Sequence, residues 1–293
     1  MKGFGRILTA MVTPFHDDFS VNYQGAADLA RYLVANGSNG VVVTGSTGEA
    51  ATLSNEEKLK LYSTVLDAVG DKATVIAGTG SNDTRASIEL TQAAERLGVH
   101  GAMLVVPYYN KPPQEGFYQH FKGIAEATAL PLILYNVPGR TGSNLLPATV
   151  ARLAAITNIV AIKEASGNLE QAAEIIRITP KDFALYSGDD SLTLPILAVG
   201  GIGVISVAAH VVGNGMQEMI AAYFNKDMAK AQAIQGELLP FFKTMFITTN
   251  PIPIKTAVTL MGQNCGPFRL PLVPPSASEF EQIEAILRKI NML

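Results

Sequence analysis

Short runs of apolar, often β-branched residues recur along the chain. Each run is almost continuously apolar instead of alternating with polar residues, which is typical of strands covered on both faces of a parallel sheet. We therefore predict eight strands. They lie at residues 6–15, 40–45, 73–80, 101–109, 131–138, 159–165, 183–190 and 201–209.

Most segments between these runs have the spacing of apolar residues that predicts helices. Residues 55–70 have Ser54 as a suitable N-cap and Gly70 as a C-terminal stop, and residues 82–98 end in the same way at Gly98. Strand and helix alternate eight times, which predicts a (β/α)8 barrel. A doubly wound open sheet is the alternative, but such sheets rarely contain eight consecutive strand and helix units.

The pattern changes after residue 225, where only helices are expected, around 227–247, 254–262 and 276–290. We predict a catalytic barrel over residues 1–225 and a C-terminal helical extension over residues 226–293. A chain of 293 residues fits this division because α/β barrels use roughly 250 residues as one domain.

Composition indicates which binding partners and which cellular compartment to expect. The formal net charge of −3 gives no reason to expect nucleic acid or an anionic membrane as a partner. Cys265 is the single cysteine, so no intrachain disulfide can form and a reducing cytoplasm is the expected location. The apolar stretch before Thr13 is too short for a signal peptide, and residues 191–217, although uncharged, contain proline and several glycines and fit a buried strand and helix better than a membrane span.

Polar motifs follow the predicted strands where a barrel places its catalytic groups, at the carboxyl ends. The motif TGSTGEA follows the second strand, PYYN ends the fourth, YNVPGRTG the fifth, KEASG the sixth and SGDD the seventh.

Lys163 ends the apolar run IVAIKEA. The alternative to a catalytic role is a solvated amine or one paired with a carboxylate such as Glu164. If the side chain points into the barrel, poor hydration disfavours the ammonium form and leaves an amine that attacks carbonyl groups. The expected product is a Schiff base.

Tyr135 ends the preceding strand, and its phenol is placed to move the protons that imine formation requires, unless its hydroxyl is merely solvated. The GSTGE loop, residues 45–49, can direct backbone amides and the hydroxyls of Ser46 and Thr47 toward an anion. A plain turn uses the same residues, and the loop matches neither a P-loop nor a dinucleotide fingerprint.

Arg140 has a planar guanidinium whose donors can bind both oxygens of a carboxylate, although loop arginines are often only solvated. Tyr108 and Tyr109 are either packing residues or acids. Asp189 and Asp190 lack a His or a third carboxylate at ligand spacing, so we expect no metal.

GSTGE, PYYNKP, YNVPGRTG and IKEASG, in this order and spacing, resemble the pyruvate-dependent class I aldolases of the dihydrodipicolinate synthase and N-acetylneuraminate lyase superfamily. The resemblance covers nearly the whole chain, including the helical tail. It implies a barrel in which Lys163 forms an imine with pyruvate and the resulting enamine attacks an aldehyde, with no further cofactor.

The resemblance also implies roles for other residues. Tyr135 is the proton shuttle, and Thr47 receives the pyruvate carboxylate. Ser46, where the family usually has Thr, links Tyr135 to Tyr109 of a neighbouring subunit. Gly188 and Ile205 match positions that line the pocket near bound pyruvate.

Arg140 implies the branch of the family that condenses pyruvate with aspartate 4-semialdehyde on the route to diaminopimelate and lysine. Cleavage of a keto-deoxy sugar acid or a sialic acid is the alternative in the same superfamily, and a non-catalytic barrel that binds a small acid is the alternative in another class. Most members are homotetramers built as dimers of dimers, and some are dimers.

The positions that match the family's allosteric cleft predict weak regulation. Asn82 and Tyr108 match those of members inhibited by lysine, whereas those members usually carry His or Glu at the position of Lys58 and Glu at that of Ala86. A cation at Lys58 and a missing carboxylate at Ala86 disfavour a bound lysine. We expect little or no lysine feedback.

Overall fold

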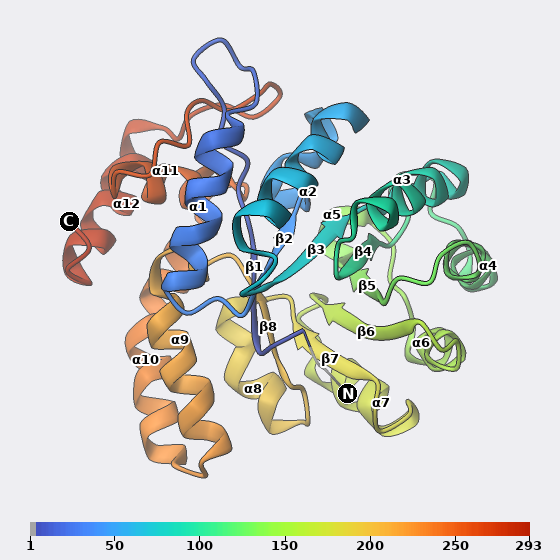
Figure 1. Ribbon diagram of the computed structural model, residues 1–293. Coiled ribbons are helices and arrows are strands. Elements are labelled where there is room, and N and C mark those ends of the chain that lie inside the picture. Colours follow the sequence, from blue (N-terminus) through green and yellow to red (C-terminus); the bar gives the residue numbers. More distant parts are fainter. Residues whose placement is uncertain (1–3) are drawn as a thin grey trace. The chain divides into compact units, whose positions relative to one another are not determined.

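The computed structural model describes residues 4–293, and its eight strands form a closed barrel in the order β1 to β8 (Figure 1). This confirms the predicted (β/α)8 barrel, and each strand lies inside its predicted segment. The strands are β1 (Ile7–Ala10), β2 (Gly40–Val43), β3 (Thr74–Gly78), β4 (Gly101–Val105), β5 (Leu132–Asn136), β6 (Ile159–Glu164), β7 (Ala184–Ser187) and β8 (Gly203–Ser206).

Helices separate the strands along the chain. They are α1 (Tyr23–Ala35), α2 (Asn55–Val69), α3 (Thr84–Leu97), α4 (Gln114–Glu126), α5 (Pro138–Thr141), α6 (Pro147–Ala154), α7 (Leu169–Ile178), α8 (Thr193–Ala198) and α9 (Ala209–Phe224). Three more helices, drawn in orange to red in Figure 1, follow β8 and α9: α10 (Met228–Thr244), α11 (Ile252–Leu260) and α12 (Ala277–Lys289). They lie where the apolar spacing predicts them.

The contacts of the chain define two compact units. One contains residues 76–205, and the other combines residues 5–75 with residues 206–293. The predicted boundary between residues 225 and 226 stays a prediction.

The first unit is built on four strands in parallel register. Strands β4, β5, β6 and β7 pair in sequence, and this register places Tyr135 beside Lys163 and Lys163 beside Tyr186. Buried rings on α4, including those of Phe117 and Phe121, contribute to the core of this unit. Burying such a side chain stabilises a fold by about 1.5–3 kcal/mol.

The second unit joins the beginning of the chain to its end. Ser54 is the N-cap of α2 and Ser276 is the N-cap of α12, each with a capping box in which the serine hydroxyl accepts from the backbone N–H of the third helical residue. The α12 side chains of Ile283 and Leu287 are fully buried, so the last helix contributes to the core of this unit. Within residues 4–293, no helix has both the length and the apolar character needed to cross a membrane.

Candidate active site

Lys163 and Tyr135 lie at the ends of neighbouring strands. They are directly paired in the register of β6 and β5, and the Lys163 Nζ lies 4.4 Å from the centroid of the Tyr135 ring. Both residues are buried, with 4% and 6% of their surfaces exposed. The structure therefore brings together the two residues that the sequence predicts as nucleophile and proton shuttle.

The Lys163 amine has no acidic partner among the described residues. Its Nζ makes no hydrogen bond or ion pair with any residue that the structure describes, 4–293. On the other side of β6, Tyr186 of β7 is paired with Lys163 in the strand register. Burial raises the pKa of the Tyr186 phenol. The Lys163 nitrogen is therefore not held by a carboxylate of the described chain, which suits a group that is to react with a substrate carbonyl.

The next residue on β6, Glu164, points to the opposite face, as strand geometry requires. Its carboxylate accepts hydrogen bonds from Asn136 Nδ2 (3.0 Å) and from Gln171 Nε2 on α7 (3.3 Å). Its other oxygen accepts from the backbone N–H of Ser166 (2.6 Å). The sequence suggested Glu164 as a partner for Lys163, but the carboxylate is engaged elsewhere.

Arg140 lies on the short helix α5 directly after β5. Pro138 begins this helix and Gly142, with a φ of 66°, ends it in the left-handed region that glycine favours. Arg140 is exposed. The loop thus presents a guanidinium close in sequence to Tyr135.

Gly188 and Ile205 were also predicted to line the pocket. The backbone N–H of Gly188 donates to the Glu164 carbonyl oxygen at 2.7 Å, and a Cβ at Gly188 would lie 2.4 Å from the Cβ of Ala165. Only glycine fits there without moving the chain. Ile205 is fully buried on β8. Their contact with a substrate stays a prediction.

The structure joins two of the three predicted allosteric residues. Asn82 Nδ2 donates to the Tyr108 carbonyl oxygen at 3.2 Å, and Asn110 Nδ2 donates back to the Asn82 carbonyl oxygen at 2.9 Å. Tyr109 follows with a φ of 71° and is 89% exposed. Lys58 lies on α2 in the other unit, half-buried, and burial lowers its pKa.

The GSTGE loop lies in the second unit and has an unusual backbone. Thr44, which precedes it, and Glu49, its last residue, both have a φ of 55°, a conformation that is uncommon outside glycine and for a β-branched residue a genuine outlier. Gly48 closely approaches the residue that follows β1, since a Cβ there would lie 3.0 Å from the Met11 carbonyl oxygen. Ser46 is exposed and Thr47 is buried.

Thr47 is oriented by a residue that sequence reasoning missed. Asn250 Nδ2 donates to Thr47 Oγ1 at 2.9 Å. An amide nitrogen only donates, so the Thr47 hydroxyl accepts this bond and its own proton stays available for another acceptor. The arrangement suits a hydroxyl that binds an anionic oxygen.

Lys255 on α11 is a second missed residue. It is fully buried, and its Nζ lies 2.8 Å from Glu49 Oε1 and 2.6 Å from the Pro267 carbonyl oxygen. The other Glu49 oxygen accepts from the Arg269 backbone N–H at 3.1 Å. These contacts hold the end of the GSTGE loop. The signal that identified Lys163, one lysine within an apolar run, also marks Lys255 in PIPIKTAV.

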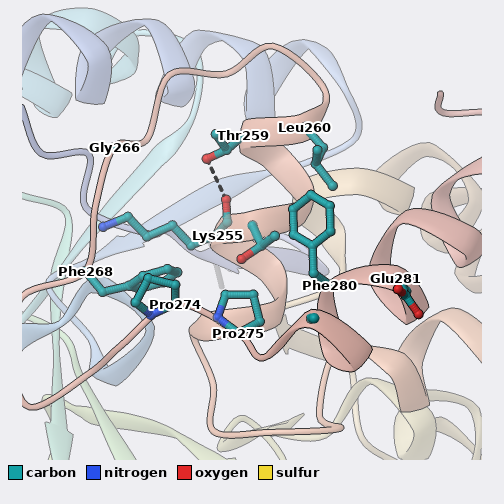
Figure 2. A pocket seen from close by; sticks show the side chains of 11 residues that line it. Lys255, Thr259, Leu260, Gly266, Phe268, Pro274, Pro275, Phe280 and Glu281 are labelled. Atoms are coloured by element: carbon teal, nitrogen blue, oxygen red, sulfur yellow. Dashed lines mark hydrogen bonds between the residues drawn. The ribbon is translucent and has the colours of Figure 1, made fainter. Parts of the chain in front are cut away.

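A cavity of about 450 Å³ lies beside Lys255 (Figure 2). Its lining is mainly apolar and includes the rings of Phe268, Pro275 and Phe280, while the Thr259 hydroxyl donates to the Lys255 carbonyl oxygen at 2.8 Å. Among residues 4–293, no three His, Cys, Asp or Glu side chains gather as metal ligands would.

Comparison with known proteins gives a consistent result. Residues 3–290 match the model of the dihydrodipicolinate synthetase family. The chain is 58% identical over 294 residues to a 4-hydroxy-tetrahydrodipicolinate synthase from Cyanothece sp., and the alignment covers 100% of both chains.

Solved structures give the same result. A dihydrodipicolinate synthase from Cyanidioschyzon merolae with lysine bound superposes with a TM-score of 0.98 and 48% identity, covering 99% of each chain. One from Bacillus anthracis superposes with a TM-score of 0.96 and 50% identity, covering 98% of this chain and 99% of that one.

Proposed function

The chain belongs to the dihydrodipicolinate synthetase family and is a pyruvate-dependent lyase, and from this premise we propose how its residues carry the reaction. In this proposal Lys163 forms an imine with pyruvate, which then condenses with L-aspartate 4-semialdehyde to 4-hydroxy-tetrahydrodipicolinate. The observation that supports it best is the buried Lys163 amine, 4.4 Å from the Tyr135 ring and not paired with a carboxylate within the described chain.

The covalent steps follow from an amine beside a phenol. The Lys163 nitrogen attacks the ketone carbon of pyruvate, and the ketone oxygen takes a proton to give a carbinolamine. Loss of water gives the imine, and loss of a methyl proton gives the enamine, whose carbon attacks the aldehyde while the aldehyde oxygen takes a proton. The amino group of the semialdehyde then adds to the imine carbon, which closes the ring and releases the Lys163 amine. Tyr135 donates and accepts the protons of these steps.

Thr47 is assigned to the carboxylate of pyruvate. The support is chemical: Asn250 occupies one lone pair of the Thr47 hydroxyl, and the hydroxyl proton stays available for an anionic acceptor. Ser46 completes a relay between Tyr135 and Tyr109 in this proposal, and its exposure is compatible with that role.

Arg140 is assigned to the carboxylate of aspartate semialdehyde, because a guanidinium binds a carboxylate through two parallel hydrogen bonds. Sugar aldehydes lack this group. The exposed Arg140 on α5 therefore favours the semialdehyde over the sugar aldehydes of the alternative reaction.

Tyr109 is assigned to the active site of a second copy of the chain. Its ring is 89% exposed, and its left-handed backbone projects it from the loop after β4. A homotetramer built as a dimer of dimers is the proposed assembly. Sedimentation of the wild type and of Tyr109→Ala, with activity measured at each concentration, tests it. A fully active monomer would contradict the assignment.

Borohydride trapping tests the covalent step. Incubation with pyruvate and borohydride, followed by mass analysis of peptides, is expected to find the reduced pyruvate adduct on Lys163. Lys163→Arg serves as the control because it keeps a cation but forms no imine. An adduct on another lysine, or none, would contradict the mechanism.

A comparison of second substrates tests the substrate assignment. The rate with aspartate semialdehyde is compared with the rate with sugar aldehydes, each in the presence of pyruvate, and a faster rate with a sugar would contradict the assignment.

A further inference from the structure

Glu164 is a buried carboxylate to which the proposed reaction gives no role. Only 4% of its surface is exposed, and it makes no ion pair with the residues described, 4–293. Its oxygens are satisfied by three neutral donors: Ser166 N at 2.6 Å, Asn136 Nδ2 at 3.0 Å and Gln171 Nε2 at 3.3 Å. Burying a carboxylate without a cation is costly, so a specific function has to account for its position.

The strand register relates this carboxylate to the reacting pair. Tyr135 pairs with Lys163, and the next two residues, Asn136 and Glu164, pair with each other. Successive side chains point to opposite faces of a strand. The contact of Asn136 with Glu164 therefore links the same strand ends on the face opposite to that of Lys163 and Tyr135. Any slip of β6 against β5 would break the contact of Asn136 with Glu164 and separate Lys163 from Tyr135.

Asn136 also closes the loop that carries Arg140. Its Oδ1 accepts from the Leu145 backbone N–H at 2.9 Å, and its Nδ2 donates to Asn144 Oδ1 at 2.8 Å. Residues 136 and 145 are thereby held together, with Arg140 between them on α5. Asn144 is fixed in turn by Gln171 through two hydrogen bonds of 2.8 and 3.1 Å.

We propose that Glu164 is a positioning residue that acts through Asn136, aligning the loop of Arg140 with the strand of Lys163. It sets where the carboxylate of the second substrate is bound relative to the imine. This inference rests on the proposed function, since it assumes that Arg140 binds aspartate semialdehyde.

The donors around Glu164 make the proposal specific to the carboxylate. In Glu164→Gln the amide can still accept from Ser166, but its NH₂ then faces the NH₂ groups of Asn136 and Gln171. The opposite orientation of the new amide would set its NH₂ against the Ser166 N–H, the closest of the three contacts at 2.6 Å. We therefore expect Asn136 to turn over instead, which places its NH₂ against the Leu145 N–H and releases the loop. The substitution barely changes the volume, so packing stays comparable.

A second variant reverses the side-chain bonds of the network and keeps the two bonds from the backbone N–H groups of Leu145 and Ser166. In Glu164→Gln with Asn136→Asp, the new carboxylate at position 136 accepts from the new amide at position 164, from the Leu145 N–H and from a reoriented Asn144. Gln171 turns over as well and accepts from the same new amide. The pair keeps one carboxylate and all of its hydrogen bonds. Recovery in this double variant separates hydrogen bonding from a general effect of substitution.

Steady-state kinetics with both substrates test the inference. We expect Glu164→Gln to raise the KM for aspartate semialdehyde about tenfold, the effect of one buried unsatisfied donor, with borohydride trapping of pyruvate retained. The double variant is expected to recover most of this loss. Glu170→Gln, an exposed acid on the adjacent helix, is the matched control and is expected to behave as wild type.

Arg140→Ala supplies the decisive background. If Glu164 acts through the Arg140 loop, Glu164→Gln adds little to the KM change of Arg140→Ala. A further tenfold rise in the KM for aspartate semialdehyde when Glu164→Gln is added to Arg140→Ala would overturn the inference. So would a larger effect of Glu164→Gln on the KM for pyruvate than on that for the semialdehyde, or kinetics of Glu164→Gln equal to those of Glu170→Gln. Failure of the proposed function is distinguishable, because the wild type itself would then not turn over the semialdehyde.

Discussion

The end of β6 and the helix α11 each bury a lysine, and they do so in different ways. Lys255 is fully buried with a carboxylate at 2.8 Å and a carbonyl oxygen at 2.6 Å. Burial lowers its pKa, and Glu49 opposes this effect. Lys163 is 4% exposed and lies against the Tyr135 ring without such partners among the described residues.

The difference teaches that burial alone does not make a lysine reactive. A paired amine such as that of Lys255 uses its donors and its charge within the protein, so it stabilises a loop. An amine without a carboxylate keeps its bonding capacity for a ligand. The number of partners, more than the depth of burial, distinguishes the structural role of Lys255 from the nucleophilic role proposed for Lys163.

The largest expected effect is a loss of activity without a loss of stability, on substitution of Lys163. Lys163→Ala is expected to lower kcat at least about 10⁴-fold, or about 5 kcal/mol of activation free energy, because no other described group replaces the imine nitrogen. Its melting temperature is expected to stay at or above that of wild type, since no ion pair of Lys163 is lost. Coupled turnover and calorimetry measure the two. Retention of a tenth of the activity would end the distinction drawn between the two lysines.

The second effect is the reverse, a loss of stability. Lys255→Met is expected to lower the free energy of unfolding by about 3–5 kcal/mol, because Glu49 is left buried without its cation. Urea unfolding measures this loss. The control is the double variant with Glu49→Gln, which removes the orphaned charge and is expected to be more stable than Lys255→Met. Equal stabilities of the two variants would contradict the account.

Two histidines extend the comparison to uncharged groups. His210 Nε2 accepts from the Val12 N–H at 3.1 Å and its Nδ1 donates to the Val207 carbonyl oxygen at 2.8 Å, whereas His120 is bonded through Nδ1 to Thr84 and its Nε2 lacks a partner within residues 4–293. Burial lowers the pKa of both from 6.5 to about 4.

The neutral forms are therefore favoured in the folded state, and the stability that they contribute is present above pH 6.5 and lost as the pH falls toward 4. The loss is expected to reach about 3 kcal/mol for each histidine. Urea unfolding from pH 7 to 4 should show a smaller loss for His120→Gln than for wild type. His210→Gln is expected to be the less stable of the two variants at pH 7, because it disturbs two bonded backbone groups. An identical pH dependence in all three proteins would refute the assignment.

The smallest effect concerns Lys58, which is half-buried and neither paired like Lys255 nor placed like Lys163. We expect free lysine at about 1 mM to lower the rate less than about twofold, since a cation at Lys58 and the absence of a carboxylate at Ala86 disfavour it. Rate against lysine concentration measures this. Lys58→His with Ala86→Glu is the matched variant, expected to gain inhibition. An inhibition constant well below a millimolar for the wild type would contradict the prediction.

The fold could be predicted in detail because it depends on local signals. Each strand lies in a mainly apolar run, and α2 begins directly after its N-cap Ser54 and ends before Gly70, as the caps indicate. The pairing of Lys163 with Tyr135 was also predictable, since both residues lie near the end of a strand and adjacent strands of a barrel align their ends. Their catalytic roles stay a prediction.

The supporting contacts were not predictable, because they depend on register and on distant segments. Glu49 and Lys255 are 206 positions apart, and Asn136 and Glu164 are paired only through the alignment of two strands. Lys163 and Lys255 interrupt apolar runs in the same way, so the sequence signal alone cannot assign their different roles.

The discontinuous second unit has a consequence for synthesis on the ribosome. Residues 5–75 emerge first, yet the partners of the GSTGE loop, Asn250, Lys255 and the Arg269 backbone, emerge last. The intervening unit, 76–205, is synthesised completely before the second unit is, so the middle of the nascent chain can fold before residues 5–75 have all of their partners. Chains stalled near residue 225 should therefore be cut by protease within the first 75 residues, while the segment that bears Lys163 resists.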